Sequence, residues 1–392
     1  MLISQPSNRM KEVSSFHVMD VMTRAKKMEA AGHDIVHMEV GEPDFSTTQP
    51  IVDAGIEFLQ QAVVHYTEAQ GLPALRQKIS DFYLQQYGVS VAIDRVFITP
   101  GASGALTVAL AMLLDKGDEV LMPDPGYPCN SNLTTLFGGQ PKIVSVDAED
   151  NFQWTREKVL SHWSDSTKGL MVASPSNPTG TLISAERLSD LVETVKEKGG
   201  FLISDEIYHG LTYEQRANSA LEYSDDVFIL NSFSKFFGMT GWRLGWLIVP
   251  EQAISAATRL MQNLYISSPT HSQYAALAAF EDDAQAVLLA RRDEFKARRD
   301  VLFQGLEELG FVIEHKPQGA FYIYADCSAF TDDSYAFALE LLEQQGVAVT
   351  PGIDFGRNKP ERYLRFAYTT SRQQIELGLT RIKAFLVSKG LV

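Results

Sequence analysis

The sequence contains little cysteine and no long apolar segment. Its 392 residues include only two cysteines, Cys129 and Cys327, which lie far apart and do not form a metal-binding spacing. We therefore predict two free thiols in a reducing compartment and no metal site. The first residues lack the apolar core of a signal peptide, and no apolar run approaches the roughly 20 residues that span a bilayer. We expect a cytoplasmic protein without a membrane partner.

Basic residues are also scarce relative to acidic ones. The chain has 34 Lys and Arg against 49 Asp and Glu, which gives a formal net charge of −15. A protein that binds nucleic acid needs a basic face, so we expect no nucleic-acid partner. The composition is otherwise that of a globular protein, 45% hydrophobic and 21% charged, and it contains no repeat or linker-like stretch. The length favours two or three domains.

From residue 50 to residue 282, the chain alternates short apolar runs with runs of helical periodicity. Such alternation predicts an α/β fold in which a mostly parallel sheet lies between helices. We therefore expect a large domain over residues 50–282. Its helix candidates include Gly104–Leu114 and Ala185–Lys198, and its seven strand candidates are Val96–Thr99, Glu119–Met122, Lys142–Val146, Leu170–Ala173, Phe201–Ser204, Val227–Leu230 and Gly245–Val249.

The two ends of the chain show a different pattern. Residues 283–392 begin with a long charged helical pattern, Ala284–Leu309, and continue as a smaller α+β domain. Residues 1–49 contain a helical pattern and a short strand candidate before the turn at Gly41. The further helices expected in these parts are Val13–Ala31, Ser334–Gln345 and Gln373–Ser388, and the strands are Ile35–Val40, Ala320–Tyr324, Val347–Thr350 and Tyr363–Ala367.

The most informative segment is Asn231–Trp246, NSFSKFFGMTGWRLGW. Lys235 follows an apolar strand candidate and has small residues around it, among them Ser232. Desolvation at such a strand end favours the neutral amine, the form that condenses with an aldehyde. Arg243 follows and could clamp a phosphate with two fixed donors. For Lys235 alone, a solvated lysine in a glycine-containing loop is the alternative.

Three other strand candidates are followed by informative residues, and ligands gather at the carboxyl ends of strands in α/β sheets. The small residues of TPGASGAL, Thr99–Leu106, could bring backbone N–H groups to a phosphate. SPSNPTG, Ser174–Gly180, fixes a rigid turn that presents Asn177. In DEIYHG, the buried charge of Asp205 needs a partner, such as a protonated pyridine nitrogen. Plain turns and a helix-capping aspartate are the alternatives.

In order and in sequence, these segments closely resemble those of class I/II aminotransferases, enzymes of fold type I that use pyridoxal 5′-phosphate (PLP). PLP combines an aldehyde with a phosphate. The resemblance implies that Lys235 is the catalytic residue and forms the Schiff base with PLP. It also implies contacts with the cofactor phosphate from Ala102, Ser103 and Arg243, with Ser232 nearby, with the phenolic oxygen from Asn177 and Tyr208, with the ring nitrogen from Asp205, and with the ring face from Tyr127.

Two further residues carry the expected partner chain and the expected substrate. Tyr66, in HYTEAQGLPALR, matches a family tyrosine that reaches the phosphate of the neighbouring subunit, which implies a homodimer with shared active sites. Arg365, in YLRFAY, matches the arginine that binds the substrate α-carboxylate with two parallel hydrogen bonds, and Gly41 and Asn177 lie beside it. A core tyrosine and a structural salt bridge are the respective alternatives. The resemblance also joins residues 1–49 to the small domain.

We therefore expect an aminotransferase that exchanges an amino group between an L-amino acid and a 2-oxo acid by a ping-pong mechanism. Phe16, His17 and Val18 would lie at the pocket mouth, or simply pack a helix. Two apolar residues beside a titratable histidine favour neutral donors, such as alanine or aromatic amino acids, at least as much as aspartate. A carbon–sulfur lyase of the same fold type is the main alternative. A PLP-sensing regulator would need a DNA-binding module, for which residues 1–13 leave no room.

Overall fold

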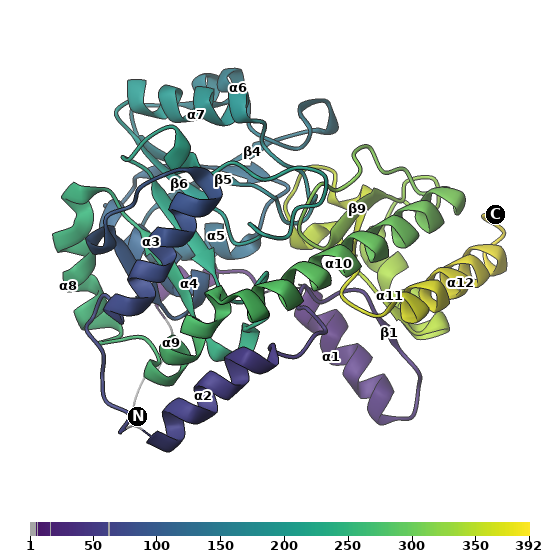
Figure 1. Ribbon diagram of the computed structural model, residues 1–392. Coiled ribbons are helices and arrows are strands. Elements are labelled where there is room, and N and C mark those ends of the chain that lie inside the picture. Colours follow the sequence, from purple (N-terminus) through teal and green to yellow (C-terminus); the bar gives the residue numbers. More distant parts are fainter. Residues whose placement is uncertain (1–4, 6, 16, 62) are drawn as a thin grey trace.

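The computed structural model describes residues 5, 7–15, 17–61 and 63–392, and a seven-stranded sheet lies at the centre of its larger part (Figure 1). Strands β3 to β7 run parallel to one another, whereas β8 is antiparallel to both of its neighbours. The predicted α/β fold with a mostly parallel seven-stranded sheet is therefore confirmed. In spatial order the strands are β2 (Val96–Thr99), β8 (Gly245–Ile248), β7 (Phe228–Ser232), β6 (Phe201–Asp205), β5 (Thr167–Ala173), β3 (Glu119–Asp124) and β4 (Gln140–Ser145).

Helices cover both faces of this sheet because its inner strands are apolar on both sides. In β2, Val96 and Ile98 join one core cluster while Phe97, between them, joins another. This alternation follows from the two-residue period of a strand. The helices of the larger part are α2 (Gln49–Gln61), α3 (Pro73–Tyr87), α4 (Gly101–Leu113), α5 (Pro128–Leu136), α6 (Arg156–His162), α7 (Ala185–Glu197), α8 (Ile254–Leu264) and α9 (Thr270–Leu277).

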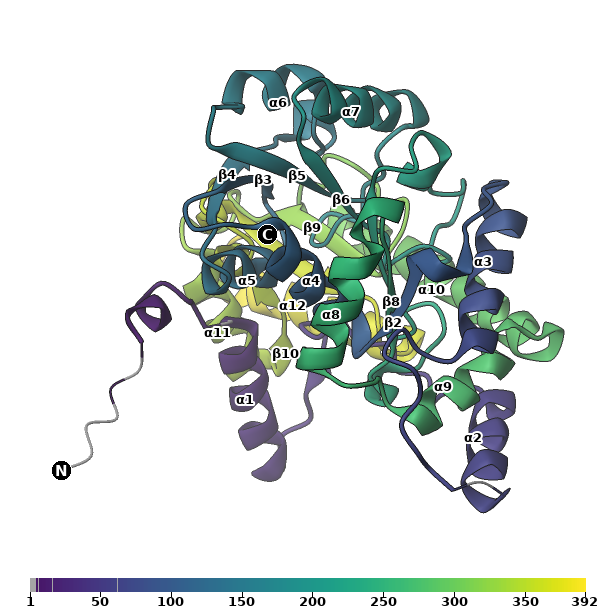
Figure 2. The ribbon, with the colours of Figure 1, turned by 90° about the vertical axis from the view of Figure 1, so that its left-hand side faces the viewer.

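A second, smaller part follows the long helix α10 (Asp282–Glu308), which runs from one part to the other (Figure 1). Its antiparallel sheet has the order β11–β12–β9. The N-terminal helix α1 lies beside α11 and β10 of this part (Figure 2), and β1 pairs in parallel with β10. The elements are α1 (His17–Ala30), β1 (Val36–His37), β9 (Tyr322–Asp326), α11 (Ser334–Gln345), β10 (Val347–Ala348), β11 (Thr350–Pro351), β12 (Tyr363–Ala367) and α12 (Arg372–Ser388).

Several predicted boundaries in the smaller part were wrong. The helix predicted from Val13 begins at His17 among the described residues: Val13 to Ser15 are not helical, and Asn8–Lys11 before them form a 3-10 helix. The strand expected over 347–350 is two strands, because the chain leaves β1 after Ala348 and pairs with β12 from Thr350. The strand expected from Ala320 begins two residues later, because Ala320 has a φ of 57°, which an extended strand does not allow.

The predicted strand Ile35–Val40 was also too long. Only Val36–His37 pairs as β1, and the carbonyl of Met38 then accepts a hydrogen bond from Ala367 of β12. The N-terminal segment therefore crosses from one small sheet to the next within a few residues. Among the helices of the described ranges, none is both long and apolar enough to cross a membrane.

Candidate active site

A cavity of about 400 Å³ opens where β5, β6 and β7 end, and residues of the smaller part line its other side. The sheet brings the predicted motifs together here because parallel strands end at the same edge. Every residue predicted to bind the cofactor or the α-carboxylate, except Tyr66, lines the cavity, namely Gly41, Ala102, Ser103, Tyr127, Asn177, Asp205, Tyr208, Ser232, Lys235, Arg243 and Arg365.

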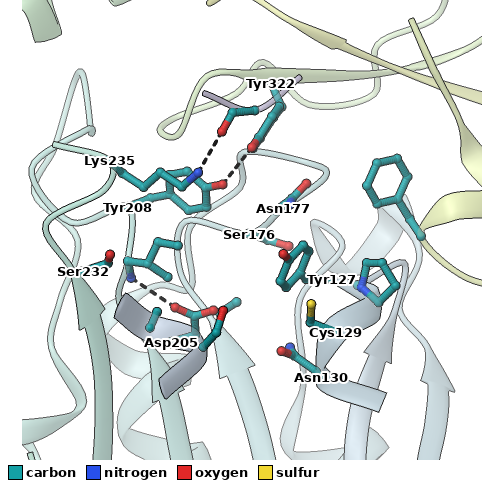
Figure 3. Close-up of a pocket in the computed structure, with 18 of the residues that line it drawn as sticks. Tyr127, Cys129, Asn130, Ser176, Asn177, Asp205, Tyr208, Ser232, Lys235 and Tyr322 are labelled. Carbon is teal, nitrogen blue, oxygen red and sulfur yellow. Dashed lines mark hydrogen bonds between the residues drawn. The ribbon is translucent and has the colours of Figure 1, made fainter. Parts of the chain in front are cut away.

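Lys235 lies three residues beyond the end of β7, with its amine directed into the cavity (Figure 3). Its Nζ donates a hydrogen bond to the carbonyl oxygen of Gly41 at 2.7 Å, across 194 residues of sequence. The pKa of this amine is lowered from 10.5 to about 8, mainly by burial and also by the positive charges of Arg365 and Arg243, while the charge of Glu42 opposes the shift. A substantial fraction of the amine is therefore neutral near pH 8 and can act as a nucleophile or a base.

Asp205 is the last residue of β6 and lies below Lys235 in the close-up (Figure 3). Its Oδ1 accepts a hydrogen bond from the N–H of Ile207 at 3.1 Å. Burial raises the pKa of this carboxyl to about 7, although the bond from Ile207 and the charge of Lys235 lower it. A carboxylate in this position gains from a cationic partner, such as a protonated ring nitrogen.

The start of α4 forms a cradle of backbone groups that side chains would otherwise fill. A Cβ on Gly245 would lie 2.9 Å from the backbone nitrogen of Ala102, and a Cβ on Gly101 would lie 2.6 Å from Nη2 of Arg243. No side chain caps this helix, whose N-cap residue is Pro100. The uncapped N–H groups, the positive end of the helix and the guanidinium of Arg243 together suit a phosphate.

Tyr208 and Asn177 border the upper side of the cavity (Figure 3). The hydroxyls of Tyr208 and Tyr322 are hydrogen-bonded at 2.8 Å, and burial raises the pKa of both phenols. Gly41 is required beside them, because a Cβ on it would lie 1.8 Å from the hydroxyl of Tyr322. The sequence analysis missed Tyr322, whose local sequence differs little from that of an ordinary aromatic core strand.

Arg365, on β12, is 5% exposed and is held by contacts from three directions. Its Nη1 donates to Oδ1 of Asn177 at 2.9 Å, and its Nη2 donates to the carbonyl of Glu39 at 2.6 Å. The guanidinium lies 4.2 Å and 4.8 Å from the ring centroids of Tyr322 and Phe355. Its Nε is buried without a hydrogen-bond partner in the described structure, so one donor remains for a ligand carboxylate.

Tyr127 lies across the cavity from Lys235, with Cys129 and Asn130 below it (Figure 3). Its side chain is 42% exposed, and burial of its hydroxyl beside the thiol of Cys129 raises its pKa. Burial also raises the pKa of the Cys129 thiol, which makes this thiol a weak nucleophile. Nowhere in the described ranges do three or more His, Cys, Asp or Glu side chains form a group that could hold a metal ion.

The residues expected at the pocket mouth behave differently from one another. Val18 lines the cavity, whereas the ring of His17 packs edge-on against Tyr335, 5.8 Å away, and does not line it. The expectation for His17 is therefore corrected: successive residues of a helix point about 100° apart, so His17 faces α11. Phe16 lies outside the described residues. Tyr66 is 77% exposed in the segment after α2, away from the lining of this cavity.

Residues that no motif indicated also reach the cavity. Met19 and Met22 of α1 line it, as do Glu39 and Asp354. Both carboxylates are buried, and burial raises the pKa of Asp354, while the N–H of His17 and the charge of Arg365 lower it. These side chains come from segments without a strand-end signal, so only the folded chain identifies them.

The fold matches that of known enzymes. The crystal structure of an aminotransferase from Mycobacterium tuberculosis superposes on it with a TM-score of 0.95, at 36% sequence identity, covering 98% of this chain and 100% of the other. Together with the cavity at the strand ends, this similarity defines the fold as that of the fold type I aminotransferases. The sheet and the residues at its edge therefore form the frame shared by these PLP enzymes.

Comparison with related sequences identifies the family within this fold class. The family described as "Aminotransferase class I and II" matches residues 33–382. The (5-formylfuran-3-yl)methyl phosphate transaminase of Methanocaldococcus jannaschii is 40% identical over 97% of this chain and 99% of its own length. The valine–pyruvate aminotransferase of Mycobacterium tuberculosis is 37% identical over 96% of this chain and 97% of its own length. The chain belongs to the class I and II aminotransferase family.

The predictions of family, activity and cofactor are thereby confirmed: the protein is a PLP-dependent aminotransferase that acts on amino acids and 2-oxo acids. The cavity fits PLP on structural grounds as well. The glycine-bounded start of α4 accepts a phosphate, Asp205 offers a buried carboxylate, and Lys235 offers an amine with a lowered pKa. The relatives carry different substrate names, so family membership leaves the amino donor open.

Proposed function

We propose that this aminotransferase works by a ping-pong mechanism in which Lys235 is the catalytic residue. The observation that carries the proposal is the convergence of Lys235, Asp205 and Arg365 on one cavity. When bound, PLP supplies an aldehyde that condenses with amines and a ring that accepts electrons from the substrate Cα. The α4 cradle with Arg243 would hold its phosphate, and Asp205 would keep its ring nitrogen protonated.

The side chains of the chain then have distinct tasks. Arg365 binds the α-carboxylate through its free Nε and its guanidinium edge, while Asn177 fixes the guanidinium. As a general base, Lys235 takes the proton from the substrate Cα. As a general acid, it then gives this proton to the cofactor carbon that had carried the aldehyde. Its lowered pKa matches it to this task near neutral pH. Tyr127, which lines the cavity, would cover one face of the cofactor ring and restrict its tilt.

A half-reaction tests this mechanism against the lyase alternative. The holoenzyme is mixed with an amino donor and no 2-oxo acid acceptor. We expect one equivalent of 2-oxo acid per active site, followed by a halt until an acceptor is added. Continuous release of pyruvate and ammonia from a cysteine-type donor, without any acceptor, would identify a carbon–sulfur lyase instead.

We also propose that the protein is a homodimer with shared active sites. Exposed apolar side chains follow α2 and α8, with Val63 75% exposed, Tyr66 77% and Ile266 53%. The two segments adjoin, because Thr270 donates a hydrogen bond to the carbonyl of His65 at 2.6 Å. Ile266 has a φ of 65°, a costly conformation for a β-branched residue that persists only where its surroundings impose it. A second copy of the chain would cover these residues and impose it.

Mixing two defective variants tests whether Tyr66 serves the neighbouring site. Lys235→Ala and Tyr66→Ala are purified separately and then allowed to exchange subunits. A hybrid dimer then contains one site with both residues intact. We expect activity to recover to about a quarter of the wild-type value, since about half of the dimers are hybrid and each has one intact site. No recovery, despite subunit exchange shown by mass spectrometry, would mean that Tyr66 acts within its own chain.

The domain division and the location of the protein are proposals too. A large domain over residues 50–282 and a small domain made of residues 1–49 and 283–392 are supported by the pairing of β1 with β10. A cytoplasmic location is supported by the two free cysteines, Cys129 and Cys327. Fractionation of cells that express the tagged full chain tests the location.

A further inference from the structure

A carboxylate from the C-terminal part of the chain fixes one wall of the cavity. Asp354 is 6% exposed and lines the cavity next to Phe355. Its Oδ1 accepts the backbone N–H of His17 at 2.7 Å, and its Oδ2 accepts that of Val18 at 3.4 Å. These contacts join the first residues of α1 to a loop 337 residues away in sequence. Since Val18 lines the cavity, the position of Asp354 determines the position of this wall.

Helix α1 has few other anchors. Only Val21 and Ala25 of this helix are buried, in a small cluster with three residues of the smaller part. Its ion pairs with other segments, Arg24 with Glu343 and Glu29 with His37 at 3.1 Å, join side chains that are partly exposed. Exposed ion pairs contribute little to stability. The hydrogen bonds that Asp354 accepts from His17 and Val18 are therefore the main polar contact that fixes the end of α1 nearest the cavity.

The wall that α1 forms is apolar. Val18, Met19 and Met22 line the cavity from α1, and within the described residues Asp354 and Glu39 are the carboxylates that line it besides Asp205. Glu39 is fully buried: its Oε1 pairs with Nδ1 of His37 at 2.7 Å, a contact that raises the pKa of His37 to about 9, and its Oε2 has no hydrogen-bond partner in the described structure.

The cationic side chains that line the cavity, within the described residues, are Lys235, Arg243 and Arg365. Each of them already has a task in the proposed function: the reacting amine, the phosphate and the α-carboxylate, respectively. The α1 side of the cavity therefore offers apolar contact to a substrate side chain but no counter-charge to a second carboxylate.

We infer that Asp354 is a specificity-determining residue: it holds the apolar wall of α1 in place, and its charge rejects amino acids that carry a side-chain carboxylate. The preferred donors then have uncharged, largely apolar side chains. Two like charges in a poorly solvated cavity repel one another strongly, so a carboxylate next to Asp354 costs far more than an amide of the same shape. This inference rests on the proposed function, because it takes Arg365 as the site of the α-carboxylate.

The half-reaction of the holoenzyme with single donors tests the inference without any acceptor. Leucine, glutamine and glutamate are compared by stopped-flow absorbance, because glutamine and glutamate differ in charge but hardly in shape. We expect the second-order rate constant of the half-reaction to be about a hundredfold higher for leucine than for glutamate, and about tenfold higher for glutamine than for glutamate. Aspartate completes the series and should also react more slowly than leucine.

Three variants separate charge from position. Asp354→Asn keeps an oxygen that can accept the N–H of His17 but removes the charge, so the preference for glutamine over glutamate should fall to about twofold while leucine changes less than about threefold. Asp354→Ala also removes the acceptor, so KM for leucine should increase by about tenfold with a smaller change in kcat. Asp332→Asn, an exposed change of the same charge, serves as the control and should leave all ratios unchanged.

The outcomes distinguish this inference from the function on which it rests. If no donor undergoes the half-reaction, the proposed function itself fails. If donors react but glutamate or aspartate equals or exceeds leucine, the inference is wrong and the proposed function stands. An equal loss with all donors in Asp354→Asn would reduce Asp354 to a purely structural role and would also overturn the inference.

Discussion

The floor and the mouth of the cavity are built in different ways. The floor consists of strand ends: Asp205 is the last residue of β6, and Asn177 and Lys235 follow within four residues of the ends of β5 and β7. Backbone hydrogen bonds between neighbouring strands hold these strand ends. The mouth consists of α1 and the loop around Asp354, which meet through side-chain bonds to two backbone N–H groups. The floor is therefore fixed by a cooperative sheet, and the mouth by a few contacts between distant segments.

This difference separates reaction from substrate choice. In the proposed function, residues of the floor act on the cofactor or on the groups that all amino acids have in common. Residues of the mouth would face the substrate side chain, which differs between amino acids. The named relatives agree in transferring amino groups but differ in substrate. The comparison predicts that floor variants affect all donors equally, whereas mouth variants change their ranking.

The largest effect is expected at the centre of the floor. Lys235→Ala removes the amine that we propose binds the cofactor and moves the proton, so transamination should fall by at least about a thousandfold for every donor. Steady-state rates with leucine and alanine measure the loss, and absorbance shows whether PLP is still attached covalently. Lys198→Ala, at the exposed end of α7, is the control. Turnover at the wild-type rate in Lys235→Ala would show that Lys235 is not the catalytic residue.

The second floor variant should lose activity and gain stability. Asp205→Asn should lower kcat by about a hundredfold while PLP still binds, because the α4 cradle remains. The folded pKa of Asp205 is about 7, against an unfolded value near 3.8. Ionisation of this carboxyl therefore lowers the stability of the apoprotein progressively as the pH increases from about 4 to 7. Above about pH 7 the full loss of stability is reached.

Asp205→Asn should therefore raise the melting temperature of the apoprotein at pH 8, and the gain should shrink as the pH is lowered toward 4. A gain of about 1 kcal/mol corresponds to roughly 2–4 °C or less in a chain of this size. Differential scanning calorimetry at several pH values measures it. A gain that does not depend on pH would exclude the electrostatic explanation and point to repacking.

At the border between floor and mouth, Arg365 contacts both Asn177 and the segment before Gly41. Arg365→Lys keeps the charge but loses the planar two-donor geometry and the free Nε, so kcat/KM should fall by about 10- to 100-fold. The fall should be similar for leucine, alanine and aspartate, because the α-carboxylate is common to them. A change in the ranking of the three donors would mean that Arg365 contributes to the choice of side chain, as residues of the mouth do, and would contradict its assignment to the α-carboxylate.

The smallest effect concerns pH. Burial lowers the pKa of Lys235 to about 8, so the rate at which the apoprotein binds PLP covalently should level off above about pH 8. An ordinary lysine would continue to gain reactivity up to about pH 10. Because the charge of Asp205 raises the pKa of Lys235, the inflection should move to lower pH in Asp205→Asn. An inflection near pH 10 in the wild-type protein would mean that the amine is well solvated.

The floor could be predicted from the sequence to a large extent. The strands over 96–99, 201–205 and 228–232 are short apolar runs, and the motifs with Asn177, Asp205 and Lys235 come directly after such runs. A strand ending in a polar residue among small residues is a local signal. The topological rule that ligands gather at strand ends then places the three side chains together without any knowledge of distances.

The mouth could not be predicted in the same way. The hypothesis for Val18 came from a resemblance, and His17 turned away from the cavity because the rotation of the helix depends on its packing. Tyr322, Asp354 and Glu39 line the cavity without any motif around them. Even the break between β10 and β11 depends on the tertiary structure, because β10 pairs with β1 in one sheet and β11 pairs with β12 in another.

The sequence by itself determined the class of fold, the cofactor and the reacting groups, because periodicity and short motifs encode elements and their ends locally. Only the tertiary structure decided the shape and charge of the wall that faces the substrate side chain. Asp354 and the N–H of His17 are 337 residues apart, and their contact depends on how α1 packs against the smaller part. Contacts of this kind follow from packing in three dimensions, which no local pattern in a single chain records.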